Sequence, residues 1–173
     1  MFNRVCVFAL LLVAPLLSDA ATPLNDARIA HIAYTAGQID IDAAKLALTK
    51  STSNEVRGFA ETMLRDHTAV NERALDLVKK LGVSPEDNDT SSSLLASAMK
   101  AEQLQLALSG EDFDRAYVDN EVAYHDQVNA ALRSLLIPGA TNPELKALLQ
   151  DGLALFSEHQ KHAEMLKAEL AQQ

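Results

Sequence analysis

The sequence predicts an all-helical protein, an antiparallel four-helix bundle with one short additional helix. Three observations lead to this prediction. Apolar residues recur every three or four positions through four long segments, and Gly and Pro fall between those segments. Runs that alternate apolar and polar residues with the period of a strand are nearly absent. The 173-residue chain is long enough to bury one proper core.

The N-terminal residues have the layout of an export signal rather than of a bundle helix. Arg4 gives a positive start, and residues 5–17 form an apolar run that is too short to span a bilayer comfortably. Small residues precede a cleavage point after Ala20. We therefore expect a signal peptide at residues 1–20, a helical domain at residues 21–173, and a periplasmic location. An uncleaved membrane anchor is the alternative.

Composition limits the classes of partner. The only cysteine, Cys6, lies in the predicted signal peptide, so any metal site of the mature chain must use histidines and carboxylates. The net charge of −9 disfavours binding to nucleic acid or to an anionic membrane surface. No later segment is apolar enough for stable membrane insertion. A metal ion, a protein partner or a second copy of the chain remain as partners.

The first long helix is predicted at residues 26–50, where apolar residues step by three and four. The second opens at a Thr-Ser-Asn-Glu capping box, with Thr52 as the N-cap and Glu55 reaching back. It runs to Leu81, after which Gly82 supplies a left-handed stop. The join between the two is only a few residues long, which forces antiparallel neighbours.

A shorter helix is predicted at residues 92–108, and we interpret it as a crossover element of the kind seen in ferritin-like bundles. The next long helix follows a Ser-x-x-acid cap at residues 109–112 and ends near Leu136, ahead of Pro138. The last long helix is predicted from position 143 to about position 171. Asn142 is its N-cap, and a proline occupies its first helical position.

Three histidines lie near the middle of three different predicted helices. His67 and His125 each follow the start of their helix by 14 residues, and His159 does so by 16. These positions are about 21–24 Å along helices of about 40 Å. Residues at mid-height of an antiparallel bundle share one layer whichever way each helix runs. Each histidine also lies three, four or seven residues from apolar neighbours, so that all three can point inward.

The first helix has no histidine at this height, but it has Asp40, between the small residues Ala36 and Ala43. Imidazole is a good ligand for Zn, Cu, Ni and Fe, and one carboxylate completes a tetrahedral or open site. We therefore predict a single transition-metal ion, zinc first with copper or iron as alternatives, held by His67, His125, His159 and Asp40. A layer of hydrogen-bonded structural histidines is the competing interpretation.

Four further residues are predicted to surround this site or to replace a ligand: Asp66, Glu121, Glu158 and His162. His162 is three residues after His159 and could join it, although its place near Glu158 favours solvent. Ferritin-like di-iron enzymes carry Glu-x-x-His on two helices. This chain has Glu-x-x-x-His at both places instead. No thiol, serine-nucleophile or phosphate-loop motif is present, so the sequence favours a protein that is not an enzyme.

Several segments are shared with a known family: Met63-Leu-Arg-Asp-His67, Asn71, Ser109-Gly-Glu-Asp-Phe-Asp114, Tyr117, His125 and His159. Through them the chain resembles the bacterial exported family called "domain of unknown function 4142", over about residues 28–170. The resemblance implies a ferritin-like four-helix fold and export in Gram-negative and related bacteria. It implies no settled activity. The family usually carries Glu at the position of Asp40, so this chain offers a shorter acid there.

Three functions remain open from the sequence. The first is an exported metal-binding protein that buffers or senses metal or supports stress resistance. The second is a structural or protein-interaction module without metal, in which the histidines are hydrogen-bonded to Asn71, Tyr117 or Tyr124. The third, an oxidative di-metal enzyme, is disfavoured by the missing Glu-x-x-His pairs.

Overall fold

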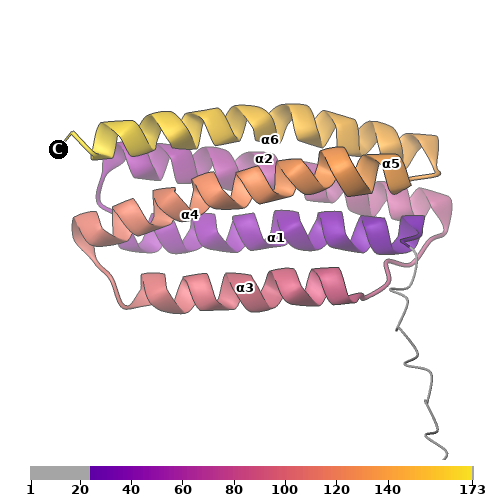
Figure 1. Ribbon diagram of the computed structural model, residues 1–173, viewed down its shortest axis with the longest axis horizontal. Coiled ribbons are helices and arrows are strands. Elements are labelled where there is room, and N and C mark those ends of the chain that lie inside the picture. The colour runs from indigo at the N-terminus through magenta and orange to yellow at the C-terminus, as the bar shows by residue number, and fades with distance from the viewer. Residues whose placement is uncertain (1–23, 173) are drawn as a thin grey trace, which may run out of the picture.

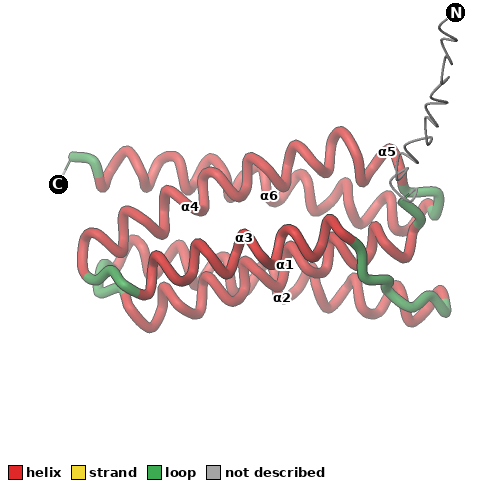
Figure 2. Tube along the Cα trace, turned by 60° about the horizontal axis from the view of Figure 1, so that its bottom comes forward, coloured by secondary structure: helices red, strands yellow, loops and turns green. Residues whose placement is uncertain are grey.

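A computed structural model describes residues 24–172, so the predicted signal peptide lies outside the described part of the chain. Within residues 24–172 every regular element is a helix, which confirms the predicted class (Figure 2). The four long bundle helices are α1 (Asp26–Lys50), α2 (Asn54–Leu81), α4 (Gly110–Ala131) and α6 (Pro143–Leu170). The other elements are α3 (Asp89–Leu106), the π-helical turn η1 (Leu132–Leu136) and the single turn α5 (Ile137–Gly139).

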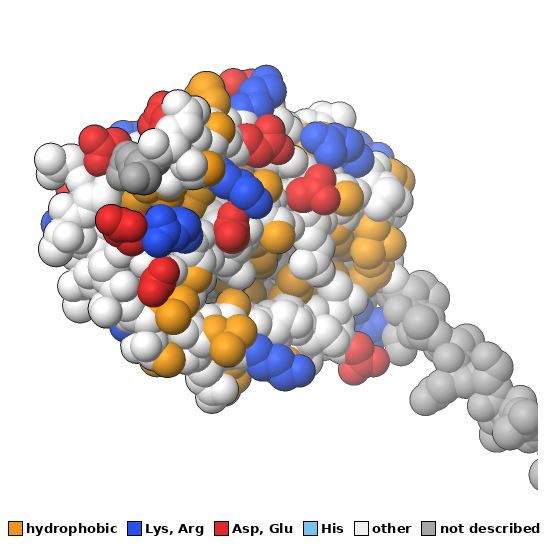
Figure 3. Space-filling view, turned by 60° about the vertical axis from the view of Figure 1, so that its left-hand side comes forward, with side chains coloured by type: hydrophobic (Ala, Val, Ile, Leu, Met, Phe, Trp, Pro, Cys, Tyr) orange, Lys and Arg blue, Asp and Glu red, His pale blue; other side chains and the backbone are white. Residues whose placement is uncertain are grey.

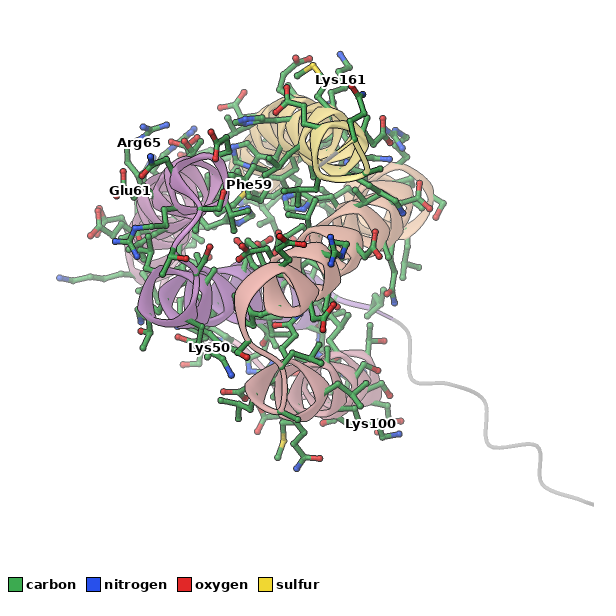
Figure 4. The ribbon with its side chains drawn as sticks, turned by 90° about the vertical axis from the view of Figure 1, so that its left-hand side faces the viewer. Lys50, Phe59, Glu61, Arg65, Lys100 and Lys161 are labelled. Atoms are coloured by element: carbon green, nitrogen blue, oxygen red, sulfur yellow. The ribbon has the colours of Figure 1, made fainter. Side chains whose placement is uncertain are left out.

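The four long helices form two antiparallel hairpins, α1 with α2 and α4 with α6 (Figure 1). The hairpins pack together so that α1 lies against α4 and α2 lies against α6. α3 runs back along the outside of α1 and α4 and returns the chain to the end where α2 begins. Viewed along the bundle, the four long helices surround a common interior and α3 lies outside them (Figure 4). This is a ferritin-like arrangement with α3 as its crossover helix.

The helix caps explain where most of the elements begin and end. Ser53, and not the predicted Thr52, is the N-cap of α2: its Oγ accepts the Val56 N–H at 3.3 Å. Thr52 was the wrong choice because the helix begins one residue later than the capping-box pattern suggests. Gly82 adopts a left-handed conformation (φ 64°) after α2, as expected. Asn142 caps α6 as predicted, accepting two backbone N–H groups.

Two boundaries differ from the prediction. α3 begins at Asp89, three residues earlier than expected, because Asn88 and Ser91 form a reciprocal capping box. The helical path after α4 does not stop at Leu136 but continues through η1 and α5 to Gly139. The π turn, in which the Ile137 N–H bonds to the Leu132 carbonyl, precedes Pro138. Proline has no backbone N–H to donate, and the wider π turn before it lets the helical path continue without that hydrogen bond.

The core consists of two apolar clusters with a polar layer between them. One cluster includes Phe59, Met63 and Tyr117, and lies toward the α1–α2 turn. The other surrounds Leu132 and Phe156, toward the opposite end of the bundle. At the heights between the clusters, α1, α2, α4 and α6 each contribute buried polar side chains. The fold thus places ionisable groups where the apolar core is interrupted.

Candidate metal centre

The three predicted histidines meet in the polar layer. His67 comes from α2, His125 from α4 and His159 from α6, and each is at most 4% exposed. Their ring centroids lie 5.7 Å apart for His67 and His125, 5.3 Å for His67 and His159, and 5.6 Å for His125 and His159. One ring nitrogen from each lies within 4.8 Å of the other two. The structure therefore brings together the residues that helix counting placed at one height.

Asp40 supplies a carboxylate from the fourth helix, α1. Its Oδ2 lies 3.2 Å from Nε2 of His67 and 3.6 Å from Nε2 of His125, and the residue is 1% exposed. Among the described residues, the Asp40 oxygens accept no hydrogen bond except from a protonated Glu121 carboxyl. Each of the four bundle helices thus presents one potential ligand to the same small volume.

Two of the histidines have one ring nitrogen fixed as a donor, which leaves the other free to bind. Nδ1 of His125 lies 3.0 Å from the Glu121 carbonyl oxygen, which can only accept, so Nδ1 carries the proton. Nε2 of His159 lies 3.0 Å from the Asp66 carboxylate. The remaining nitrogens, Nε2 of His125 and Nδ1 of His159, are buried and have no hydrogen-bond partner in residues 24–172. Metal-binding histidines characteristically donate their second N–H to a carbonyl or carboxylate in this way.

His67 is held by stacking rather than by a hydrogen bond. Its ring lies 4.5 Å from that of Phe156, with an interplanar angle of 9°. Burial lowers the pKa of His67 to about 4, although the nearby Asp40 carboxylate acts in the opposite direction. Burial also lowers the pKa of His159, against the effect of its bond to Asp66. Both imidazoles are therefore neutral at pH 7, the form in which imidazole binds metal.

Glu121 lies within the layer and not outside it. It is buried one helical turn before His125, and its Oε2 lies 3.5 Å from Nδ1 of that residue. Burial raises the pKa of Glu121 well above its usual value, and the charge of Asp40 and a hydrogen bond with Asp40 raise it further. This shift favours the protonated form of Glu121 beside the Asp40 carboxylate. Asp40, Glu121 and His125 form a second set of mutually close potential ligands.

Asp66 lies at the edge of the layer and connects it to the surface. Its side chain is 18% exposed and accepts hydrogen bonds from Arg65 as well as from His159. The pKa of Asp66 is lowered, because these bonds and charges outweigh the effect of its partial burial. It therefore remains ionised and supports His159 from the outer side, as the sequence predicted for a surrounding residue.

Two of the predicted surrounding residues lie away from the layer. Glu158 is exposed and bonds to Lys161 at 2.7 Å. His162 is exposed as well, with its ring edge-on to Phe59 at 5.1 Å. The solvent position favoured for His162 is thus the one it occupies, whereas Glu158 is wrong as a surrounding residue. On α6, Glu158 and His162 face away from the bundle interior, whereas His159 faces into it.

The predicted hydrogen-bond partners of the histidines have other roles. Asn71 donates to the Tyr34 carbonyl oxygen and Tyr124 donates to the Ala36 carbonyl oxygen. The Tyr117 hydroxyl is buried with no partner in the described part. None of the three therefore forms the hydrogen bonds that would hold the histidines in a purely structural layer.

Sequence reasoning did not identify Phe156 and Asn129 as residues of this region. Phe156 stacks on His67, and Asn129 donates to the Phe156 carbonyl oxygen at 3.2 Å. Both lie on the same inward stripes as their histidines, Phe156 three residues before His159 and Asn129 four after His125. That spacing was the available signal, but a phenylalanine on an apolar stripe usually indicates ordinary core packing.

Fold and layer together define a ferritin-like helical protein with a buried histidine–carboxylate centre. The family described as "Domain of unknown function (DUF4142)" matches residues 13–166, and the chain belongs to that family. No curated protein matches the chain in sequence. No helix within residues 24–172 has both the length and the apolar character needed to cross a bilayer.

Two solved structures share the fold. One, described as a secreted DUF305 protein from Streptomyces coelicolor, has a TM-score of 0.72 at 13% identity. The match covers 84% of this chain and 93% of that one. The other is CopM in its Cu(II)-bound form, with a TM-score of 0.64 at 14% identity, covering 86% of this chain and 99% of that one. At these identities the likeness establishes the fold alone.

Proposed function

We propose that this protein binds a single transition-metal ion in the bundle core and serves as an exported metal buffer, sensor or stress-protection protein. The ligands are His67, His125, His159 and Asp40. The observation that carries the proposal is the convergence of unpartnered imidazole nitrogens from three helices on a carboxylate from the fourth. Nε2 of His125, Nδ1 of His159 and both nitrogens of His67 are buried without hydrogen-bond partners in the described residues. Oδ2 of Asp40 lies 3.2 Å from Nε2 of His67.

The energetics of burial favour this function over a purely structural one. A buried polar atom without a partner costs about 1–3 kcal/mol. A structural layer would be expected to satisfy its own hydrogen bonds, and its members would carry paired nitrogens on both sides of each ring. Here the outer nitrogens of His125 and His159 are paired and the inner ones are not. A bound cation would bind all of the inner nitrogens at once and so remove the cost of burying them unpaired.

The donor set indicates which metals fit. Three imidazoles and one carboxylate suit zinc, and they also suit copper(II), which binds nitrogen and oxygen ligands more tightly than other divalent ions of its row. No cysteine occurs after position 6 to favour copper(I). We propose zinc first and copper(II) as its competitor. The likeness to CopM, which was solved with Cu(II), gives the competitor some support.

A single ion fits better than the pair that an oxidative di-metal enzyme needs. The second ligand set, Asp40, Glu121 and His125, shares His125 with the three-histidine set. Nδ1 of His125 is already bonded to the Glu121 carbonyl oxygen, so that ring has only Nε2 to offer. Two ions would compete for one nitrogen.

An exported location agrees with the predicted signal peptide and with the likeness to a secreted DUF305 protein. We propose the periplasm. The test is metal analysis of protein purified from that compartment without chelator, with zinc and copper measured separately. One ion per wild-type chain is expected. His67→Ala should lose it, whereas His162→Ala, which removes an exposed imidazole from α6, should keep it. Metal that does not exceed trace levels after titration would refute the proposal.

A second candidate is a protein-interaction module without metal, and α3 favours it. This helix buries only Ser91 and Gln105 and exposes Leu95, Met99, Leu104 and Leu106. Hydrophobic side chains are visible at the surface in the lower part of Figure 3, where α3 lies. If this function is the correct one, Met99→Ser with Leu104→Ser abolishes partner capture while His67→Leu leaves it intact.

A further inference from the structure

We propose that the metal ion reaches the buried layer through the seam between α2 and α6, where Asp66 receives it and Arg65 covers the opening. This inference rests on the metal-binding function proposed above and names its route of access. The layer has four lateral seams, one between each pair of neighbouring bundle helices. Three of them are crossed by neutral hydrogen bonds, and the fourth is crossed by a charged group.

Three of the seams are each crossed by a neutral hydrogen bond within about one turn of the layer. Asn71 donates to the Tyr34 carbonyl oxygen across α1 and α2 at 3.3 Å. Tyr124 donates to the Ala36 carbonyl oxygen across α1 and α4 at 2.8 Å, and this bond separates the layer from a cavity of about 270 Å³ between α1, α3 and α4. Asn129 donates to the Phe156 carbonyl oxygen across α4 and α6 at 3.2 Å. None of these bonds includes a proposed ligand or offers a charged group to a cation.

The ends of the layer are closed by apolar side chains. Phe59, Met63 and Tyr117 lie on one side of it along the bundle axis, and each is at most 1% exposed. On the other side Phe156 stacks on His67 within the second apolar cluster. A hydrated cation entering along the axis would have to pass through close-packed apolar groups, where desolvation of charge is costly.

The seam between α2 and α6 is crossed instead by Asp66 and His159. Asp66 is a carboxylate that contacts a proposed ligand and also reaches solvent, with 18% of its side chain exposed. Its carboxylate can attract a cation from solvent and is 3.0 Å from Nε2 of a proposed ligand. An ion that reaches Asp66 is thus one imidazole ring away from the centre.

Arg65 covers this opening from the outside. Its Nε donates to Asp66 Oδ1 at 2.8 Å while 70% of its side chain remains exposed. In Figure 4 Arg65 lies on the outer side of α2, and Lys161 lies on the outer side of α6. The Arg65 guanidinium is bonded to the Asp66 carboxylate, and its positive charge repels an approaching cation. Because exposed pairs of this kind are weak, Arg65 can release Asp66 readily.

A residue that affects only the access route changes the energy barrier to metal binding, and it leaves the free energies of the metal-free and metal-bound protein unchanged. Removal of Arg65 should therefore raise the association and dissociation rates of the metal by the same factor, about two- to fivefold, and leave the dissociation constant unchanged. The chain offers a matched control in Arg73, on the same helix. It pairs with exposed Asp151 of α6 at 2.7 Å and does not contact the layer.

The experiment uses Co²⁺, which occupies zinc-type ligand sets and absorbs visible light. Stopped-flow mixing with apoprotein gives the association rate, and mixing of the loaded protein with excess EDTA gives the dissociation rate. Arg65→Ala should raise both rates at constant ratio, and Arg73→Ala should match the wild type. Equal rates in the two variants would overturn the route. So would a greater acceleration in Tyr124→Phe, which opens the seam between α1 and α4. If the wild type binds no Co²⁺ and no Zn²⁺, the proposed function itself fails and the route falls with it.

Discussion

A different neighbour orients each histidine ring of the layer. A backbone carbonyl orients His125, a carboxylate at the surface orients His159, and a phenylalanine ring orients His67. Only the last arrangement leaves both nitrogens of its imidazole without a hydrogen bond. His67 is therefore the residue whose protonation is governed most directly by burial.

The pKa of His67 predicts how the metal-free protein responds to acid. This pKa is lowered from 6.5 to about 4, so the unfolded chain takes up a proton as the pH falls below 6.5 while the folded chain does so only near 4. The stability that neutral His67 contributes is thus present at pH 7 and lost on acidification. We expect a loss of about 2 kcal/mol between pH 7 and pH 4.5.

Urea unfolding with chelator present, at these two pH values, measures this loss. His67→Leu should show a smaller drop in the free energy of unfolding by that amount, because the other titrating groups are common to both proteins. An identical drop in the wild type and His67→Leu would show that His67 is not buried in its neutral form.

At the level of the helices, the sequence predicted the positions of the proposed ligands better than the contacts around them. Periodicity and counting from the helix starts located His67, His125, His159 and Asp40. They could not reveal the stacking of Phe156 on His67 or the contact of Glu121 with Asp40, because both depend on how one helix faces another. The continuation of the helix through η1 was not predicted, because a proline usually ends a helix at the residue before it. Here the π turn η1 before Pro138 lets the helical path continue.

The packing of α1 on α2 depends on Gly37. A Cβ atom at this position would lie 2.3 Å from Oδ1 of Asn71, whose amide crosses the seam to the Tyr34 carbonyl oxygen. Gly37→Ala should therefore destabilise the protein by about 1–3 kcal/mol through the displaced and unpaired amide. Gly58→Ala is the matched control, because nothing lies within 4 Å of its Cβ, and it should stabilise α2 by about 0.5–1 kcal/mol.

Chemical unfolding of the two variants measures both effects. The pair separates the steric role of Gly37 from the general helix preference for alanine. Equal stabilisation in both variants would mean that α1 and α2 are not packed as closely at Asn71 as described.

At the scale of the whole molecule, the polar layer divides the core into two apolar clusters. Without metal, the buried polar layer therefore destabilises the folded protein. An ion that binds only the folded state should stabilise that state. Saturation at 100 times the dissociation constant corresponds to about 2.7 kcal/mol. Zn²⁺ should raise the midpoint of thermal unfolding in the wild type and in His162→Ala. It should have little effect on His67→Ala, and an equal shift in all three proteins would indicate binding outside the layer.

The central claim is tested most directly by a crystal structure of the protein grown with Zn²⁺, with anomalous data collected on both sides of the zinc edge. One strong zinc peak should appear within coordination distance of His67, His125, His159 and Asp40, with Asp66 still bonded to His159. A layer without any peak in zinc-saturated crystals, or a peak held only by surface groups such as Glu158 and His162, would contradict the assignment.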